Sequence, residues 1–428
     1  PSVQLGWAIS NEKWFPKTSA LNYFLLKAGY DITGNDDINN YAARTSFQVM
    51  QYLNNTSVHM LNNIGNDKIT YEKTGQWNVG FKSYLLNNRL GVDFNYYQKH
   101  TTNLLTLKTF ENPVAGINNY WSNGGSMDNQ GFEVTVTTKP VVSKDFNIEL
   151  GASVGHYENK IKTLPNDEKL YVDGVKNAQG YTSSIYGTDN IATIVGQPVG
   201  SFYGYKTAGV FATDAQAKAA GNNDYLYYLD ETGAKQYFKA GDMHFVDINK
   251  DGKIDEADKT IIGNPNPDIY GNIFGSVMWK NFTLTLGLNY SLGNDVYNYS
   301  RSVLESGSNF YNQTIAMANR WRHEGQVTDM PRLSYGDPMG NARFSDRWIE
   351  DGSYLRLKTV NISYKVPVKG DWIQGLTIWA EANNLFTITK YLGSDPEFSA
   401  ANGVLYQGID PGNVALSRTF TFGMKINL

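Results

Sequence analysis

Cysteine is absent from the 428-residue sequence, which excludes a disulfide scaffold, a thiolate metal site and a cysteine nucleophile. Histidine is scarce, and the five histidines form neither a His-x-x-x-His nor a His-Glu-x-x-His pattern, so a catalytic zinc site is not predicted. Charged residues make up only 18%, and the net charge of −4 offers no basic face to nucleic acid. We therefore predict no nucleic-acid partner and no catalytic residues.

Long apolar runs are also missing. No stretch approaches the roughly 18 consecutive apolar residues of a transmembrane helix, and the mean hydropathy is −0.43. The first residues, Pro1 to Gln4, lack the basic and apolar regions of a signal peptide, so any such signal is expected upstream. These features exclude a helical membrane protein, while an aromatic content of 14% argues against disorder.

Strict alternation of apolar and polar residues recurs along the whole sequence. In 282–290, for example, Phe282, Leu284 and Leu286 belong to one face of an extended chain, and Thr283 and Thr285 belong to the other. Such runs approach the roughly 9–11 residues with which a tilted strand crosses a bilayer, and they indicate about a dozen strands or slightly more, with little helix. Further runs lie at 24–32, 77–84, 90–97, 131–137, 146–154, 358–366, 376–382 and 419–428.

Alternation alone does not say which face is inside, because a soluble sandwich also alternates. The connections favour a barrel, since short turns at 86–89, 139–144 and 280–281 alternate with long excursions rich in Gly, Asn and Tyr. Short turns at one end and long loops at the other are typical of an outer-membrane β-barrel, whereas a sandwich distributes its loops more evenly. The long excursions lie at about 98–128, 156–200, 291–350 and 387–416.

The polar phase of these runs carries residues that suit a wet lumen better than a dry core. They include Asp31, Asp93, Glu133, Glu149 and Glu381. Rings near strand ends are candidates for the aromatic girdles at membrane interfaces, although each is as readily explained as an ordinary cross-strand pair. These rings are Trp77, Tyr96, Tyr97, Trp279, Tyr364 and Trp379.

A series of short motifs resembles the barrel of the SusC/RagA family, the TonB-dependent outer-membrane transporters of Bacteroidota. The motifs follow the family's order and extend over essentially 5–428. They are LGWAIS at 5–10, YEKTGQWNVG at 71–80, LNNRL at 86–90, GSMDNQGFE at 125–133, PVGSFYGY at 198–205, GNPNPD at 263–268, YLRLK at 354–358 and NNLFT at 383–387.

That resemblance implies an all-β fold in which residues 1–428 form the C-terminal portion of one transmembrane antiparallel β-barrel of about 22 strands, with long extracellular loops. It also implies partners: an N-terminal plug domain and further barrel strands that this sequence lacks, TonB acting through an N-terminal box, and a SusD-like surface lipoprotein as a lid. The expected location is the outer membrane, with the barrel integral in its lipid. An open set of strands leaves backbone groups unpaired in lipid at several kcal/mol each, so the missing strands must be supplied.

The sharpest local motif is the acidic segment 247–258, which lies within 241–263. It fits an EF-hand-type loop, in which oxygens at alternate positions converge on one hard cation and Gly252 permits a sharp turn. The resembled family commonly carries such a loop on its extracellular side. The alternative is an acidic turn without an ion, since Asp258 replaces the usual bidentate glutamate. We predict structural calcium with the ligands Asp247, Asn249, Asp251, Lys253 (through its carbonyl), Asp255 and Asp258.

Two long excursions place rings beside amide side chains, a combination that stacks on a sugar or peptide and hydrogen-bonds to it. The candidate substrate contacts are Tyr120, Trp121, Phe310 and Tyr311. The alternative is that these rings pack the loops against one another or against the lipoprotein lid. The segment 151–155 matches the hydrolase motif G-x-S-x-G, but it lies inside an alternating strand and does not predict a hydrolase.

The sequence thus predicts an importer that moves an oligosaccharide or oligopeptide across the outer membrane without transforming it. The alternative from another class is a soluble or surface-displayed all-β glycan-binding protein stabilised by calcium. Extraction only with detergent favours the barrel, and solubility without detergent favours the binding protein.

Overall fold

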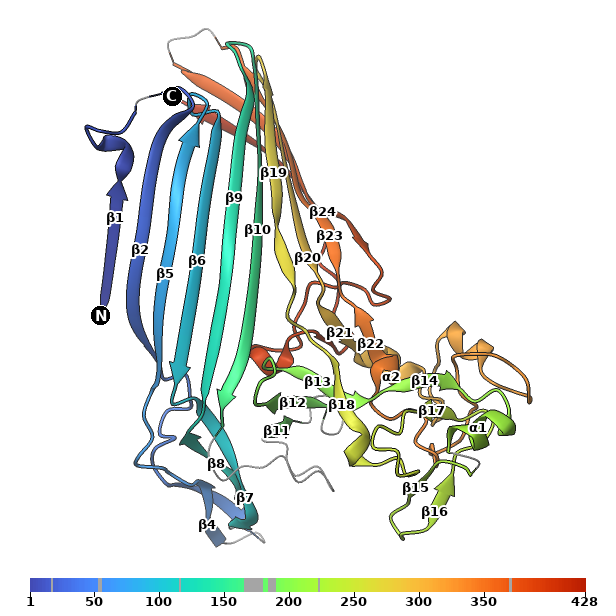
Figure 1. Ribbon diagram of the computed structural model, residues 1–428. Helices are drawn as coiled ribbons and strands as arrows, with labels where there is room; N and C mark the ends of the chain where they lie inside the picture. Colours follow the sequence, from blue (N-terminus) through green and yellow to red (C-terminus); the bar gives the residue numbers. More distant parts are fainter. Residues whose placement is uncertain are drawn as a thin grey trace. The chain divides into compact units, whose positions relative to one another are not determined.

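Eleven long strands form one antiparallel sheet in the computed structural model, which describes residues 1–428 except 17, 53–55, 115–116, 165–179, 184–189, 222–223 and 369–371. The order is β1-β2-β5-β6-β9-β10-β19-β20-β23-β24-β26, so β1 and β26 stand at the edges (Figure 1). The strands are β1 (Ser2–Ala8), β2 (Leu21–Asn35), β5 (Glu72–Leu85), β6 (Leu90–Thr102), β9 (Ser126–Val142), β10 (Phe146–Thr163), β19 (Ile269–Trp279), β20 (Phe282–Leu292), β23 (Tyr354–Val366), β24 (Gly375–Thr389) and β26 (Thr419–Asn427).

Smaller elements fill the excursions between these strands. The short strands are β3 (Ser46–Tyr52), β4 (Thr56–Asn63), β7 (Leu105–Val114), β8 (Ile117–Asn123), β11 (Gly180–Ser183), β12 (Ile191–Ile194), β13 (Ser201–Tyr205), β14 (Thr207–Val210), β15 (Tyr227–Leu229), β16 (Lys235–Tyr237), β17 (Met243–Phe245), β18 (Lys259–Gly263), β21 (Asp295–Asn298), β22 (Ile349–Asp351) and β25 (Ile409–Asp410). The α-helices in the described part of the chain are α1 (Asp214–Ala220) and α2 (Tyr299–Leu304). Helix α1 begins after Thr213, whose hydroxyl accepts the backbone N–H of Gln216 at 3.2 Å.

The chain divides into two compact units, each with its own set of strands. The first contains Pro1–Val134, Tyr157–Glu168 and Val195–Gln197. The second contains Thr135–His156, Lys169–Ile194 and Pro198–Leu428. β1, β2, β5 and β6 therefore belong to the first unit, and β19, β20, β23, β24 and β26 belong to the second, while β9 and β10 run through both.

Short and long connections alternate, as the sequence predicts. Residues 86–89 join β5 to β6 and residues 280–281 join β19 to β20, whereas residues 293–353 separate β20 from β23. The turn after β9 is shorter than the predicted 139–144, because the strand continues to Val142. The φ angle of proline is compatible with an extended chain, so Pro140 does not end the strand.

In the second unit, the register confirms that apolar and polar residues occupy opposite faces of the sheet. Directly opposed residues of an antiparallel pair share a face, so each paired row is a row of side chains. One row, on what we call the apolar face, contains Ile148, Val277, Leu284, Ile362, Ala380 and Phe422. The adjacent row, on the polar face, contains Glu149, Ser276, Thr285, Asn361, Glu381 and Thr421.

The first unit shows the same separation. Leu5, Ala28, Val79 and Tyr96 pair across β1, β2, β5 and β6 as one apolar row. The next row, on the polar face, contains Gln4, Gly29, Asn78 and Tyr97. In each of these paired strands, the residues that the sequence places in the apolar phase therefore lie on the same face of the sheet.

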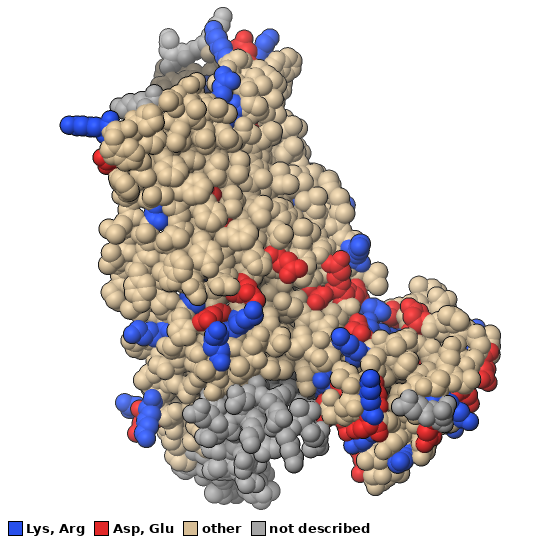
Figure 2. Space-filling view, viewed as in Figure 1, with Lys and Arg blue, Asp and Glu red and all other residues tan. Residues whose placement is uncertain are grey.

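Apolar side chains on the apolar face meet the surroundings instead of a core. Leu5 is 71% exposed, Leu150 is 47% exposed and Phe422 is 79% exposed. Figure 2 shows few Lys, Arg, Asp and Glu side chains over much of the viewed length of the strands, and many around the excursion that carries α1, β15 and β16. A sheet with this pattern needs an apolar medium against its apolar face.

Four of the six predicted girdle rings lie on the apolar face. Trp77 and Tyr96 form a ring pair at 5.5 Å between β5 and β6, with Tyr96 at the middle of β6. In the second unit, Trp279 lies beside the short turn 280–281, and Phe282 joins it to Tyr364 through ring distances of 6.5 and 4.4 Å. Tyr97 and Trp379 lie on the polar face, which corrects the sequence-based assignment for these two rings. The reason is phase, because each sits one residue away from the apolar positions of its strand.

The dry cores lie in the long excursions. One cluster contains Tyr205, Phe211, Ala217, Leu226, Phe238, Met243, Phe245, Ile254 and Met339. A second contains Ile191, Phe202, Tyr297, Trp348 and Ile409. These excursions are therefore folded structures with their own interiors.

Candidate functional site

The polar face carries hydrogen-bonded networks of uncharged and charged side chains. In the second unit, the carboxylate of Glu381 accepts hydrogen bonds from the amides of Asn361 and Asn383, both at 3.0 Å. Thr359 extends the network by donating to Asn383 at 2.9 Å. Such a wall suits contact with water and with polar solutes, because each group keeps a partner while its free side stays accessible.

In the first unit, an ion pair crosses the polar face. The ammonium of Lys27 on β2 lies 2.7 Å from the carboxylate of Asp93 on β6, although β5 separates the two strands. Gly80, which has no side chain, is the residue of β5 opposite Lys27.

The acidic segment 247–258 begins with a tight turn whose backbone N–H groups donate to one carboxylate. Asp247 accepts the backbone N–H groups of Lys250 at 2.6 Å and of Gly252 at 2.7 Å. Lys250 and Gly252 have φ angles of 62° and 82°, a left-handed conformation that favours glycine at the second position. Asn249 and Asp251 lie on the same turn and hydrogen-bond to each other at 3.0 Å. The predicted role of Gly252 in the turn is therefore confirmed.

The other three candidate ligands follow the turn. Lys253 directs its ammonium to Asp255 at 2.6 Å, and Asp258 is fully buried, where it accepts the N–H groups of Ile248 and Asp255. Burial, with a smaller contribution from Asp247, raises the pKa of Asp258 above its usual value, although these N–H groups oppose the shift. Among the described residues, no three His, Asp or Glu side chains converge as a metal site.

The turn is anchored to a folded core. Ile254 is part of the first core cluster, and its N–H donates to the carbonyl of Tyr227 at 2.8 Å. Tyr227 in turn donates its N–H to the carbonyl of Gly252 at 3.3 Å. Any ligand bound by the acidic segment would therefore bind to residues that are already attached to the first core cluster.

Buried ion pairs hold the excursions together, and periodicity in the sequence did not reveal them. Asp242 is fully buried and receives both Nε of Arg332 at 2.8 Å and Nη2 at 3.0 Å, with Asn341 as a third donor at 3.1 Å. The partners are 90 residues apart in the case of Arg332. A fully buried carboxylate needs such donors, because an unpaired charge is costly away from water.

A second buried pair anchors the last long excursion to the sheet. Arg356 lies on the polar face of β23 opposite Asn289, and it is only 1% exposed. Its Nη2 donates to Asp395, and its Nε lies 3.3 Å from the carboxylate of Glu397. Asp395 also accepts the N–H of Leu416 at 3.0 Å, so one arginine organises both ends of the excursion.

The candidate substrate contacts Tyr120 and Trp121 belong to β8 in the first unit. They pair with Lys108 and Leu107 on β7, and consecutive strand residues point to opposite faces. The backbone carbonyl of Trp121 accepts a hydrogen bond from Asn66 at 3.1 Å. The two rings are therefore not presented on one common surface.

The candidates Phe310 and Tyr311 belong to the second unit and are highly exposed, at 90% and 76%. Phe310 stacks on Tyr335, with ring centroids 4.9 Å apart. Tyr335, itself 75% exposed, was missed by sequence reasoning, because it lies 25 positions after Phe310 and no periodic pattern connects the two residues. The amide-rich composition around Phe310 was the only signal available in the sequence.

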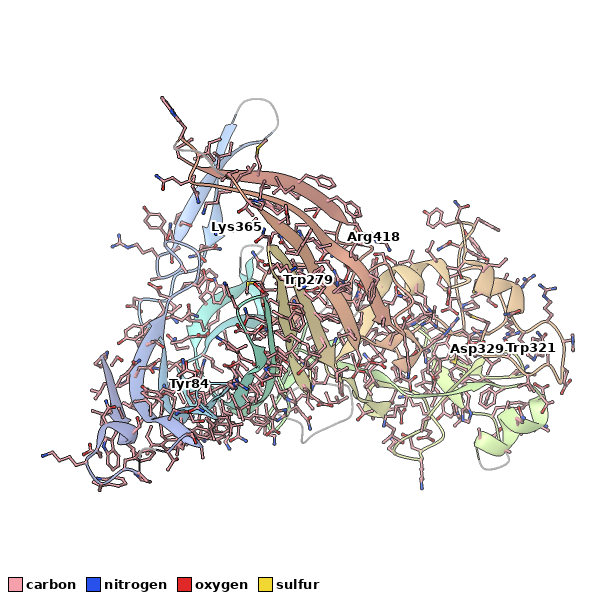
Figure 3. All side chains as sticks on the ribbon, turned by 90° about the horizontal axis from the view of Figure 1, so that it is seen from above. Tyr84, Trp279, Trp321, Asp329, Lys365 and Arg418 are labelled. Atoms are coloured by element: carbon pink, nitrogen blue, oxygen red, sulfur yellow. The ribbon has the colours of Figure 1, made fainter. Side chains whose placement is uncertain are left out.

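The neighbouring loop forms a polar depression. Figure 3 shows Trp321 beside Asp329, and the backbone N–H of Trp321 donates to the carbonyl of Met330 at 2.9 Å. The depression is lined by Ala318, Asn319, Arg322, His323, Gln326, Val327, Thr328 and Asp329. In the part of the chain that the structure describes, every helix is too short or too polar to cross a membrane.

Residues 2–249 match the family described as TonB dependent receptor-like, beta-barrel. Because this match covers more than half of the sequence, the chain belongs to the TonB-dependent receptor β-barrel family. Members of this family are integral proteins of the outer membrane, and they are transporters, not enzymes. The expected fold class and location are thereby confirmed.

Curated relatives match the chain along its whole length. TonB-dependent receptor P3 of Formosa agariphila is 28% identical over 446 residues, which cover 100% of this chain and 41% of that protein. The TonB-dependent receptor SusC of Bacteroides thetaiotaomicron is 29% identical over 450 residues, which cover 100% of this chain and 40% of that protein. The chain thus spans about two fifths of the length of these relatives.

The same fold occurs in the solved structure titled "Structure of the RagAB peptide transporter". It superposes with a TM-score of 0.76 at 23% identity, covering 99% of this chain and 43% of that one. The resemblance to the C-terminal barrel portion of the SusC/RagA family is confirmed by these matches.

Proposed function

We propose that this chain is the C-terminal part of a TonB-dependent importer that takes up an oligosaccharide or oligopeptide nutrient across the outer membrane. The observation that carries the proposal is the division of one long sheet into an apolar and a polar face, row by row. In a barrel the apolar face meets lipid, and the polar face lines a path for a polar solute. The soluble glycan-binding alternative is disfavoured, because family membership places the chain in the outer membrane.

The proposed transporter requires protein components in addition to this chain. β1 and β26 stand at the edges of the sheet, and edges in lipid require partner strands. We assign that role to the remaining barrel strands, the channel block to an N-terminal plug, the energy coupling to TonB and the lid to a SusD-like surface lipoprotein. The fold shared with the RagAB peptide transporter supports a role in transport.

The test is purification of the intact complex. Native outer membranes are extracted in mild detergent, and every co-purifying chain is identified by mass spectrometry. We expect a plug-bearing chain and a SusD-like lipoprotein in defined stoichiometry with this sequence, together with loss of nutrient uptake on deletion of its gene. Solubility of the protein without detergent, or a barrel without these partners, would contradict the proposal.

Tyr120 and Trp121 stay our candidates for contact with the substrate, as the ring-and-amide composition around them suggests. Phe310 and Tyr311 stay candidates as well, but their strong exposure supports the alternative given with them, contact with the lipoprotein. Replacing Trp121 by alanine should weaken substrate binding without changing the amount of lipoprotein bound. Titration calorimetry on the intact complex measures the first quantity, and quantitative mass spectrometry measures the second.

We also propose that the acidic segment binds calcium as a structural ion. The turn already has the left-handed residues that such a loop needs, and its oxygens come from alternate positions. The proposed ligands are Asp247, Asn249, Asp251, the carbonyl of Lys253, Asp255 and Asp258. A cation there would offset the effect of burial on Asp258 and would compete with the ammonium of Lys253 for Asp255.

Terbium luminescence tests this site. The backbone N–H of Tyr227 donates to the carbonyl of Gly252, and the ring of Tyr227 can sensitise a bound lanthanide. We expect emission on excitation of tyrosine, displacement by calcium, and a thermal midpoint that rises with calcium by mass action. The variant Asp251→Asn should weaken calcium binding about tenfold or more, whereas Glu231→Gln, an exposed acid outside the segment, should not. If emission is absent, or is equal in the wild type and Asp251→Asn, the calcium proposal is wrong and the segment is an acidic turn that binds no ion.

A further inference from the structure

The apolar face of the first unit changes character along its strands. On β6, the positions of this face are apolar up to Tyr96, and Gln98 and His100 follow at the same phase. On β5, Trp77 is the last large apolar side chain of the face, and Lys73 lies farther toward the long loops. The ring pair of Trp77 and Tyr96 therefore marks the boundary between an apolar stretch and a polar one.

A network of charged side chains begins directly beyond this boundary, and its contacts place it on the same face. The Nδ1 of His100 lies 2.6 Å from the carboxylate of Asp128 on β9, and the ammonium of Lys162 on β10 lies 3.3 Å from the same carboxylate. Lys160 precedes Lys162 by two residues, so it points to the same side of the strand, and it pairs with Glu158 at 2.5 Å. Figure 2 shows acidic and basic side chains gathered over the ends of β6, β9 and β10 that meet the loops.

The two lysines of the network are accessible from outside. The side chains of Lys162 and Lys160 are 53% and 48% exposed, whereas Asn159 and Ile161, which alternate with them along β10, are buried. Ion pairs that are this exposed contribute little to stability. Since an ammonium carries three N–H donors, a carboxylate partner orients each lysine and leaves donors for a further ligand.

The depth of the network fits the headgroup layer of a membrane. Rings of Trp and Tyr concentrate at the level where hydrocarbon meets headgroups, which here is the level of Trp77 and Tyr96. His100 lies four residues beyond Tyr96, a distance of about 13 Å along a strand and about 10 Å along the membrane normal at a typical tilt. The headgroup layer is roughly 5–8 Å thick on each side, and lysine side chains extend several ångströms from the backbone. Because the long loops of such barrels are extracellular, the network lies at the outer leaflet.

The side of the wall determines which molecules reach these lysines. A solute in the lumen meets the polar face, where Lys99 lies over the ring of Tyr97 at 5.2 Å, one residue from His100 in the chain. Molecules that cover the apolar face are lipids, and their headgroups lie at the level of the network. Lysines at headgroup level attract anionic lipids, whose phosphate oxygens accept charge-assisted hydrogen bonds.

We propose that Lys160 and Lys162 bind the headgroup phosphate of an anionic lipid in the outer leaflet. Both ammonium groups donate to the phosphate oxygens, while Glu158 and Asp128 hold the two side chains along the outside of the wall. The acyl chains of the same lipid lie on the apolar stretch that ends at Trp77 and Tyr96. One lipid therefore covers both parts of this face.

Lipid retention by the full transporter tests the site. The complete transporter is reconstituted in phosphatidylcholine vesicles that contain a small fraction of phosphatidic acid, extracted again in mild detergent, and analysed for bound lipid by native mass spectrometry. We expect the parent to retain phosphatidic acid in preference to phosphatidylcholine. The double variant Lys160→Gln and Lys162→Gln should retain about tenfold less or lower still, because each lysine at headgroup level contributes a factor of roughly five.

The matched comparison is between two single variants. Lys162→Gln removes a charge from the apolar face and should lower retention about fivefold, whereas Lys99→Gln removes a charge from the polar face and should retain phosphatidic acid like the parent. Folding of each variant is checked by heat-modifiable migration of the barrel.

Three results would overturn the inference. Equal retention by the parent and the double variant would show that the lysines do not bind the lipid. An equal loss in Lys99→Gln and Lys162→Gln would show that net charge, and not this site, controls retention. Release of the lipid by inorganic phosphate would assign the lysines to free phosphate. Each result concerns lipid binding alone and leaves the proposed import function unchanged.

Discussion

Replacing Arg356 by methionine is expected to release the last long excursion from the sheet. Arg356 is 1% exposed, and its removal leaves the 8% exposed Asp395 without its cationic partner. Removing one member of a buried ion pair typically costs about 3–5 kcal/mol, because the remaining charge stays desolvated. Since the excursion also carries Ile409 of the second core cluster, we expect local opening rather than a small adjustment.

Limited proteolysis measures this opening, because Lys390 and Arg418 supply trypsin sites at both ends of the excursion. We expect rapid cleavage there in Arg356→Met and slow cleavage in Arg322→Met, an exposed arginine of the same unit. Adding Asp395→Leu to Arg356→Met should restore part of the resistance, since replacing both partners removes the unpaired charge. Equal cleavage of Arg356→Met and the parent would show that the pair does not hold the excursion.

The same anchor should depend on pH. Although burial opposes ionisation, the hydrogen bond from Arg356 and two backbone N–H groups lower the pKa of Asp395 below its usual value. A carboxyl group whose pKa is lower in the folded protein stabilises it above the unfolded-state pKa, and this contribution is lost as the pH falls through the folded-state pKa. Cleavage of the parent by an acid-active protease should therefore rise toward low pH, and that of Arg356→Met should change less.

A charge on the apolar face should prevent or weaken insertion of the barrel. Leu286 lies in the middle of the apolar phase of β20, in a row with Leu150 and Val360. An arginine near the bilayer midplane on the lipid side of a barrel costs about 2–4 kcal/mol. Thr285→Arg is the matched control, because Thr285 is one residue away but shares its row with Glu149 and Glu381.

Urea unfolding of the full transporter in lipid vesicles compares these two variants. We expect a clear loss of stability for Leu286→Arg and little change for Thr285→Arg. A larger effect of Thr285→Arg would place the lipid on the other face of the sheet, and equal effects of the two variants would contradict the assignment of one face to lipid.

Strand positions and faces were predictable from the sequence because a strand repeats every two residues. The run 282–290 lies within β20, and 419–428 overlaps β26 over all its residues. The predicted turn at 139–144 overlaps the end of β9, because the strand accommodates Pro140 and continues to Val142. Tyr97 and Trp379 were misassigned because their ring chemistry was considered without the phase of their strands.

Contacts within the excursions were not predictable in the same way. Arg356 and Asp395 are 39 residues apart, and no periodic pattern connects irregular segments. The motif YLRLK at 354–358 marked Arg356 as a family landmark but said nothing about its buried partner. The acidic segment was recognisable because a cation loop needs oxygens at fixed spacing and a glycine in the turn, both of which are local features.

The central claim is that one face of this sheet meets lipid and the other lines an aqueous path. The chain contains no cysteine, so single cysteines can be placed at Leu284, Ile362 and Phe422, and at Thr285, Asn361 and Thr421 in the adjacent row. Spin labels at these positions in native outer membranes are compared for collision with oxygen, which partitions into lipid, and with a water-soluble nickel chelate. We predict that oxygen reaches the first row and the chelate reaches the second. Access of the chelate to both rows, or to the first row alone, would contradict the account.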